Sequence, residues 1–238
     1  MKALFHSLLA GALLLAGCSK DNVDPPKSQL TGRVVYQDQA VGVRSFGSQD
    51  LGATDRIPPS MLELWQPGYA FFNKIPVFVQ QDGTFTAELF NGHYKLVRSR
   101  GNGPWIDNTD SIDVQLNGNM TLDVPVQPYF TIQNAESQKG DTAVAATCNV
   151  TKTATKDIDV VTLFISTTSI VDAVNNVNNF DFVNSGRKNG ATITSLNTPV
   201  SLLAKIPPSF IGKTLYARIG VKAAGVGEYI YSPVQKLE

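Results

Sequence analysis

The sequence predicts an all-β protein in which two tandem β-sandwich domains follow a cleaved signal peptide. Three observations support this prediction. Apolar and polar residues alternate through most of the chain, turn pairs such as Asn-Gly and Asp-Gly separate the alternating segments, and a short apolar run ends at Cys18. No sustained 3.6-residue apolar repeat occurs in residues 18–128, so helices are not expected there.

Residues 1–17 are expected to be a lipoprotein signal peptide. The start is basic, and the apolar run over residues 8–17 is about half of the roughly 20 residues that a membrane-spanning helix needs. The ending Leu15-Ala16-Gly17-Cys18 resembles the bacterial lipobox, whose cysteine takes a diacylglycerol and becomes the first mature residue. The resemblance implies lipidation, including palmitate-type acylation, at Cys18 and attachment to a membrane through several acyl chains.

Residues 18–28 are expected to form a flexible tether. Asp21 and Asp24 resemble the acidic tether that directs Bacteroidetes-type lipoproteins to the outer face of the outer membrane, although a plain solvated linker is equally consistent with them. Pro25-Pro26 restrains the backbone, since each proline fixes its own φ and restricts its predecessor. We therefore expect a lipid-anchored, surface-exposed protein of the outer membrane.

Charge argues against nucleic acid as a partner. Removing residues 1–17 from the 238-residue chain leaves 221 residues, in which 19 Lys and Arg face 20 Asp and Glu. The sequence has no basic run, whereas phosphate binding requires clustered Lys and Arg.

The first domain is expected over residues 29–128. Its predicted strands are 30–36, 61–65, 75–79, 84–89 and 94–98, followed by a hairpin of 112–116 with 120–126 around Asn117-Gly118.

The second domain is expected over residues 129–238, with a boundary at Pro128. Its predicted strands are 142–150, 158–166, 199–206, 214–221 and 228–234, and residues 170–177 are expected to form at most a turn of helix in a loop. Once Cys18 is lipidated, Cys148 has no disulfide partner. It alternates with Val144, Ala146 and Val150, which favours a buried core cysteine over a reactive thiol.

Several segments resemble known modules. Residues 30–34 and the pair Asp82-Gly83-Thr84-Phe85 and Asn91-Gly92-His93-Tyr94-Lys95-Leu96 resemble the opening strand and hairpin of carboxypeptidase-regulatory, transthyretin-like domains. Residues 216–223 and 229–234 resemble the last strands of a fibronectin type III or immunoglobulin-like sandwich, although both tryptophans lie in the first domain.

Taken end to end, the chain resembles the domain-of-unknown-function family 3823 of Bacteroidetes lipoproteins. Residues 18–22, 62–69, 89–92 and 103–105 carry this resemblance. It implies an accessory role in a polysaccharide-utilisation (starch-utilisation-like) system, beside an outer-membrane transporter and its partner lipoprotein. It implies no reaction.

Catalysis has little support in the sequence. His6 leaves with the signal peptide, and His93 has no second histidine for a metal site or a triad. The acidic segment 107–113 could supply calcium ligands, but the EF-hand ligand order is missing and an Asx turn is the preferred interpretation. Glycosidase activity by a pair of carboxylates remains an open alternative, because the sequence does not give the distance between two carboxylates. We expect no enzyme, no cofactor and no metal.

The candidate ligand-binding residues are aromatic. Trp65, Tyr69 and Trp105 lie near Gln66-Pro67-Gly68 and Gly103-Pro104, and aromatic faces on loops can stack on sugar rings. Burial in the core or between the domains is at least as consistent with them, because most tryptophans are largely buried. The favoured prediction is a non-enzymatic, glycan-binding surface lipoprotein. The alternative is a structural or protein-interaction subunit of the uptake complex with no ligand of its own.

Overall fold

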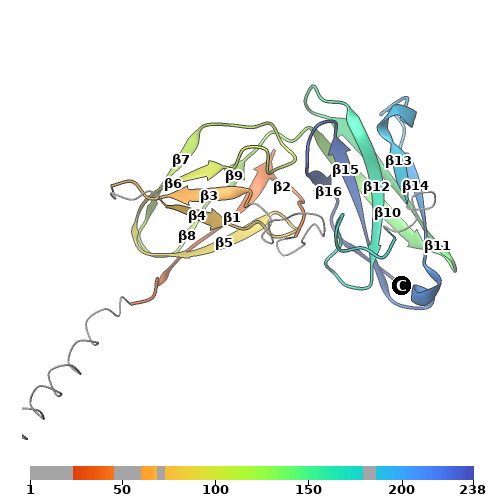
Figure 1. The fold of residues 1–238 in the computed structure, drawn as a ribbon, viewed down its shortest axis with the longest axis horizontal. Helices are drawn as coiled ribbons and strands as arrows, with labels where there is room; N and C mark the ends of the chain where they lie inside the picture. The colour runs from red at the N-terminus through yellow and green to blue at the C-terminus, as the bar shows by residue number, and fades with distance from the viewer. Residues whose placement is uncertain (1–23, 46–59, 69–72, 179–185) are drawn as a thin grey trace, which may run out of the picture.

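A computed structural model of the protein describes residues 24–45, 60–68, 73–178 and 186–238. Its strands form four sheets, two before residue 127 and two after residue 129, and the two pairs of sheets lie side by side (Figure 1). The expected all-β fold with two tandem sandwiches is confirmed. The signal peptide, Cys18 and Tyr69 lie outside the described residues. Within those ranges, no helix is both long enough and apolar enough to cross a membrane.

In the first domain, one sheet gathers β2, β5, β8 and β9 around β1, and the other has the order β4-β3-β6-β7. Burial alternates along β3: Leu62 and Leu64 are fully buried, so Glu63 and Trp65 point to the outer face. The strands are β1 (Ser28–Tyr36), β2 (Gln39–Ala40), β3 (Leu62–Trp65), β4 (Lys74–Val77), β5 (Thr84–Leu89), β6 (Gly92–Arg98), β7 (Ser111–Leu116), β8 (Met120–Thr121) and β9 (Val124–Pro125).

The predicted hairpin around Asn117-Gly118 is wrong. β7 pairs with β6, whereas β8 and β9 both pair with β1 in the opposite sheet. Gly118 does adopt a positive φ of 83°, so the pair makes a turn, but the turn carries the chain across the sandwich. β5 and β6, which resembled a hairpin around Asn91-Gly92, likewise belong to different sheets.

In the second domain, β10-β11-β14 form one sheet, and β13-β12-β15-β16 form the other, with β17 also paired to β15. The strands are β10 (Phe130–Lys139), β11 (Ala143–Lys152), β12 (Ile158–Ser166), β13 (Arg187–Asn189), β14 (Val200–Lys205), β15 (Leu215–Ala223), β16 (Tyr229–Tyr231) and β17 (Gln235–Leu237). Two short 3₁₀ helices, η1 (Gly190–Thr192) and η2 (Pro208–Phe210), lie in its loops.

Three features of this domain bear on the sequence predictions. β10 was missed, although it is ten residues long. Residues 170–177 form a loop without a helical turn, in which the carboxylate of Asp172 accepts hydrogen bonds from the amides of Val174 and Asn175 at 2.9 and 2.8 Å. Cys148 is fully buried on β11, as predicted, and burial raises the pKa of its thiol to about 11.

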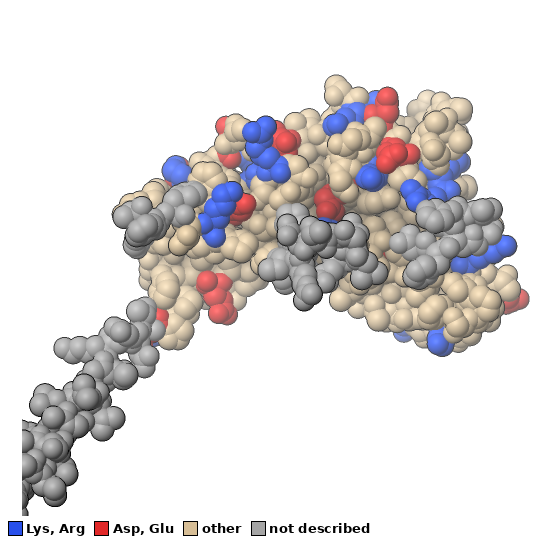
Figure 2. Space-filling model, viewed as in Figure 1, with Lys and Arg blue, Asp and Glu red and all other residues tan. Residues whose placement is uncertain are grey.

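The two domains share an extensive contact. One continuous cluster of buried apolar side chains includes residues of both, and Gly42 of the first domain forms an isolated antiparallel bridge with Tyr231 of the second. Arg44 and Glu228, each largely buried, form an ion pair of 2.8 Å across the same boundary. On the face shown in Figure 2, acidic and basic groups are interspersed.

Candidate functional site

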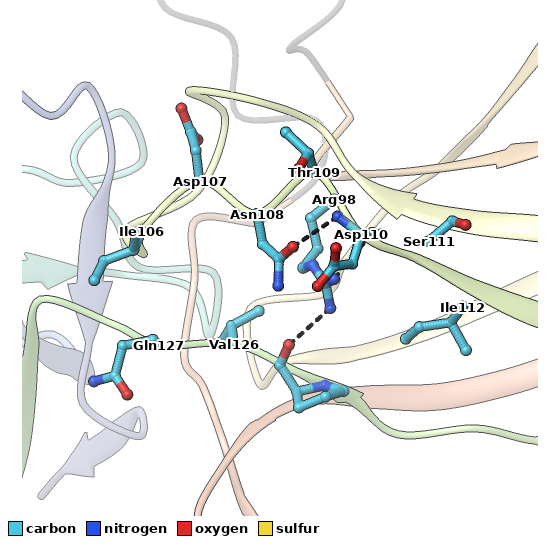
Figure 3. A pocket seen from close by; sticks show the side chains of 11 residues that line it. Arg98, Ile106, Asp107, Asn108, Thr109, Asp110, Ser111, Ile112, Val126 and Gln127 are labelled. Atoms are coloured by element: carbon cyan, nitrogen blue, oxygen red, sulfur yellow. Dashed lines mark hydrogen bonds between the residues drawn. The ribbon is translucent and has the colours of Figure 1, made fainter.

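A cleft of about 680 Å³ opens in the first domain, close to the start of the second. It is lined by Arg98, residues 106–112 and residues 125–127 (Figure 3). These segments come from different sheets: residues 111–112 begin β7, whereas residues 124–125 form β9, paired to β1. The cleft therefore lies where the edges of the two sheets of the first sandwich meet.

The walls are joined at one end of the cleft by backbone pairing. The amide of Ile106 donates to the carbonyl of Gln127 at 2.9 Å, and Trp105 forms a β-bridge with Pro128. Beyond Ile106 the two segments diverge, which leaves the space between them.

Arg98 joins the walls a second time. Its Nη1 donates to the carbonyl of Pro125 at 3.0 Å (Figure 3), and its Nη2 donates to the carbonyl of Asp110 at 3.1 Å, one in each wall. The residue is only 6% exposed. Nε is buried and finds no hydrogen-bond partner in the part of the chain that the structure describes. Because its end groups are occupied by backbone carbonyls, Arg98 holds the walls together and is a positioning residue.

The cleft presents groups that bind hydroxyls. Asp107, Asn108, Thr109, Asp110 and Gln127 bring carboxylates, amides and a hydroxyl to its lining. Such groups accept or donate hydrogen bonds to polyols, and carboxylate acceptors make the stronger ones. Ile106, 42% exposed, and Val126 add an aliphatic surface. A few polar groups around an apolar surface are typical of small-ligand sites.

The acidic segment forms an Asx turn, the interpretation that the sequence favoured. Oδ1 of Asn108 accepts a hydrogen bond from the amide of Asp110 at 2.7 Å (Figure 3), and Oδ1 of Asp107 accepts one from the amide of Gly101 at 2.8 Å. These bonds fix the loop that forms one wall. Among the described residues, no group of three or more His, Cys, Asp or Glu is placed to hold a metal ion.

The expectation that Trp105 stacks on a sugar is wrong. Its side chain is 2% exposed and belongs to the core cluster, so it has no free face. A Cβ on Gly103 would lie 2.1 Å from Cε2 of the indole, so the ring packs directly on that glycine. Trp105 immediately precedes the cleft wall, and we infer that it anchors this wall from within the core.

Trp65 lies on the outer face of β3, as the alternation predicted, and is half-buried. Its Nε1 donates to the carboxylate of Glu63 at 3.2 Å, and Nζ of Lys74 lies 5.8 Å from the ring centroid. Burial opposes ionisation of Glu63, but hydrogen bonds from Lys74 and Trp65 outweigh it and lower the pKa of that carboxyl. Trp65 lies on the outer face of β3 whereas Trp105 is buried in the core, so the two do not form one platform.

His93 is on the same outer face. Its Nε2 lies 3.1 Å from Asp113, which also accepts a hydrogen bond from Lys95 at 2.8 Å. The Lys95 hydrogen bond is the main reason why the pKa of Asp113 is lowered. This arrangement is a solvent-exposed charge cluster.

Sequence reasoning missed the cleft itself. The acidic loop was noticed, but only as a possible calcium ligand set, and Arg98 and Gln127 had no signal beyond their strand positions. The three lining segments come together only because the chain crosses between sheets at Asn117-Gly118, where a hairpin was expected.

Models of one protein family match both domains of the chain. A family model described as the N-terminal domain of the proteins of unknown function DUF3823 matches residues 28–127, and one described as the domain of unknown function DUF3823_C matches residues 130–236. No curated protein matches the sequence significantly.

Solved structures match over nearly the full length. A DUF3823 family protein from Parabacteroides merdae is 36% identical, with 90% of this chain and 100% of that chain covered and a TM-score of 0.75. One from Bacteroides ovatus is 33% identical, with 89% and 98% covered and a TM-score of 0.73. A protein from Bacteroides uniformis, described as a "putative carbohydrate binding protein", is 15% identical, with 90% and 99% covered and a TM-score of 0.70. That last likeness shows a shared fold.

Proposed function

Because the chain belongs to the DUF3823 family over both of its domains, we propose that it is a non-enzymatic, surface-exposed lipoprotein that binds glycan for an outer-membrane polysaccharide-uptake system. In this proposal, the lipid on Cys18 anchors the protein in the membrane. The protein partners in this proposal are an outer-membrane transporter and its partner lipoprotein.

The cleft between residues 106–112 and 125–127 carries the proposal. Its size of about 680 Å³ suits a short stretch of sugar chain, since ligand pockets commonly measure roughly 300–1,000 Å³. Its carboxylates and amides can form hydrogen bonds with the hydroxyls of a sugar, and Ile106 can pack against the C–H face of the ring. The Bacteroides uniformis protein of the same fold, described in terms of carbohydrate binding, is consistent with this function.

The absence of catalysis is also part of the proposal. The single histidine that remains after signal cleavage, His93, is engaged with Asp113 on the outer face of the sheet. In the cleft, Oδ1 of Asp107 is engaged by the backbone of Gly101. Hydrogen bonding of this kind orients a carboxylate for recognition of a ligand.

A panel of soluble polysaccharides tests the proposal. The mature chain carrying Cys18→Ser, residues 18–238, is run in affinity gels containing each glycan, beside the variants Asn108→Ala and Trp65→Ala. We expect at least one glycan to retard the wild-type sequence and Asn108→Ala to reduce the retardation. If Trp65→Ala alone abolishes it, the outer face of β3 around Trp65 is the site and the cleft is not.

A structural subunit without a ligand is the second candidate. The observation in its favour is the ordered contact between the domains, with a β-bridge at Gly42 and a largely buried ion pair at Arg44, which suits a spacer or brace. Absence of retardation by every glycan of the panel, together with recovery of the uptake complex on the lipidated protein, would support this candidate.

A further inference from the structure

We propose that a second cavity, in the C-terminal domain, binds small amphipathic anions, with an apolar body in the cavity and an acidic head at its mouth. The cavity has a volume of about 1020 Å³ and is lined by Thr142, Ala143, residues 176–178, Leu203 and residues 205–211. It is separate from the glycan cleft, whose lining residues all lie in the first domain.

The walls of this cavity are apolar and include unusually exposed side chains. Leu203 is 63% exposed and Ile211 is 47% exposed, although Leu202 and Ala204, which flank Leu203 on β14, are buried. The alternation along β14 turns Leu203 and Lys205 to the outside of the sheet. Large exposed apolar side chains that line a concave surface are typical of a ligand site.

The mouth of the cavity is basic. Lys205 is part of the lining, and Nζ of Lys213 lies 5.1 Å from the ring centroid of Phe210, another lining residue. Nζ of Lys139 donates to the carbonyl of Lys213 at 2.8 Å, which brings a third ammonium group to the same end of the domain. None of the described residues that line the cavity is acidic, and Asp141 immediately precedes the lining residue Thr142 in the chain.

Charge and shape together select the ligand class. A neutral apolar ligand would leave the ammonium groups unused, and a cation would be repelled by them. A polyol would leave Leu203, Ile206 and Ile211 facing its hydroxyls. A carboxylate or sulfonate on an alkyl or aryl body satisfies both parts, since burial of the body removes apolar surface from water and the head meets the lysines.

The test uses 8-anilinonaphthalene-1-sulfonate as a fluorescent probe on residues 18–238 carrying Cys18→Ser. We expect saturable binding at one site, with an affinity at least about tenfold weaker in Leu203→Asp. Phe90→Ser is the matched control, because Phe90 is 49% exposed but lies in the first domain, and it should bind as the wild type. Each variant is checked by its melting temperature.

A pair of displacing ligands tests the charge. Dodecanoate should displace the probe, whereas dodecyltrimethylammonium, with the same chain and the opposite charge, should do so at least about tenfold less well. Lys205→Gln should weaken the binding of dodecanoate by several-fold. If Leu203→Asp fails to fold, Ile211→Ser replaces it. The proposal is overturned if no saturable binding occurs, if correctly folded variants bind the probe as the wild type does, or if both displacing ligands are equally effective.

Discussion

The guanidinium group of Arg218 lies over the ring of Tyr231, 4.4 Å from its centroid, at the contact between the two domains. Arg218 is 1% exposed, and its Nε donates to the carbonyl of Ser232 at 2.7 Å. Nη1 donates to the carbonyl of Val43 at 2.9 Å, and Nη2 donates to the carbonyl of Gln81, both in the first domain. Burial lowers the pKa of Arg218 to about 10, so the group is still charged at neutral pH. One side chain thus binds the backbone of both domains.

Replacing Arg218 should therefore destabilise the whole chain. Arg218→Met leaves buried carbonyls of both domains without donors, and hydrogen bonds to a charged group contribute roughly 1.5–3 kcal/mol each, without simple additivity. We expect a loss of at least about 3 kcal/mol in the free energy of unfolding, measured by urea denaturation. Arg187→Met, at an exposed position on β13, should change it by no more than about 0.5 kcal/mol. Equal effects of the two substitutions would contradict the assigned role of Arg218.

The buried thiol of Cys148 should give a pH dependence of stability. In the unfolded chain the thiol ionises with a pKa near its ordinary value of 9.0, whereas in the folded protein the pKa is about 11. The unfolded state therefore loses this proton first, and stability falls as pH rises from 9 to 11. Between pH 8 and pH 11 the thiol should lower the free energy of unfolding by as much as about 2–3 kcal/mol. Cys148→Ala should lack this part of the pH dependence when unfolding is measured at both pH values.

Thiol chemistry gives an independent check on Cys148. A water-soluble maleimide should modify it slowly in the native protein at pH 8, because the reactive thiolate is scarce and the residue is fully buried, and rapidly in denaturant. Fast native modification would contradict its place on β11.

The two tryptophans should differ in their contributions to stability. Trp105→Ala removes a buried core side chain and should cost about 3–5 kcal/mol. Trp65→Ala, on the outer face of β3, should cost roughly 1 kcal/mol, mainly through lost contacts with Lys74 and Glu63. Thermal and urea unfolding of both variants checks this order, and the reverse order would place Trp65 in the core.

Lipid anchoring should depend on Cys18. Cys18→Ser should remove the acylated residue, and the protein should then fail to fractionate with membranes, since anchoring requires several acyl chains. Asp21→Ala with Asp24→Ala should leave the protein membrane-bound but reduce antibody labelling of intact cells. Complete partitioning of Cys18→Ser with the outer membrane would contradict the lipobox.

The fold class could be predicted because two-residue alternation depends on local burial, which the sequence records directly. Val144, Ala146, Cys148 and Val150 alternate in the sequence and are all buried on β11. The strand partners could not be predicted in the same way. An Asn-Gly pair favours a reversal of direction, but the choice between continuing one sheet and crossing to the other depends on which edge is free in the assembled sandwich.

The candidate site was predictable only in part for the same reason. Trp65 could be placed on an outer face from the burial of its neighbours Leu62 and Leu64. Trp105 has no such alternation around it, and its burial depends on the close approach that Gly103 permits. The cleft joins residues 98, 106–112 and 125–127, so it exists only once the sheet edges have met.

The central claim is that the cleft of the first domain binds glycan, and calorimetric titration tests it most directly. The titrant is the glycan most strongly retained in the affinity gels, and the proteins are the wild-type sequence, Asp110→Asn and the matched control Glu88→Gln, whose carboxylate is exposed on β5 away from the cleft. We predict that Asp110→Asn weakens binding by about tenfold, as expected for one charge-assisted hydrogen bond, while Glu88→Gln binds as the wild type. Unchanged affinity in a correctly folded Asp110→Asn, or no heat of binding with any glycan, would contradict the claim.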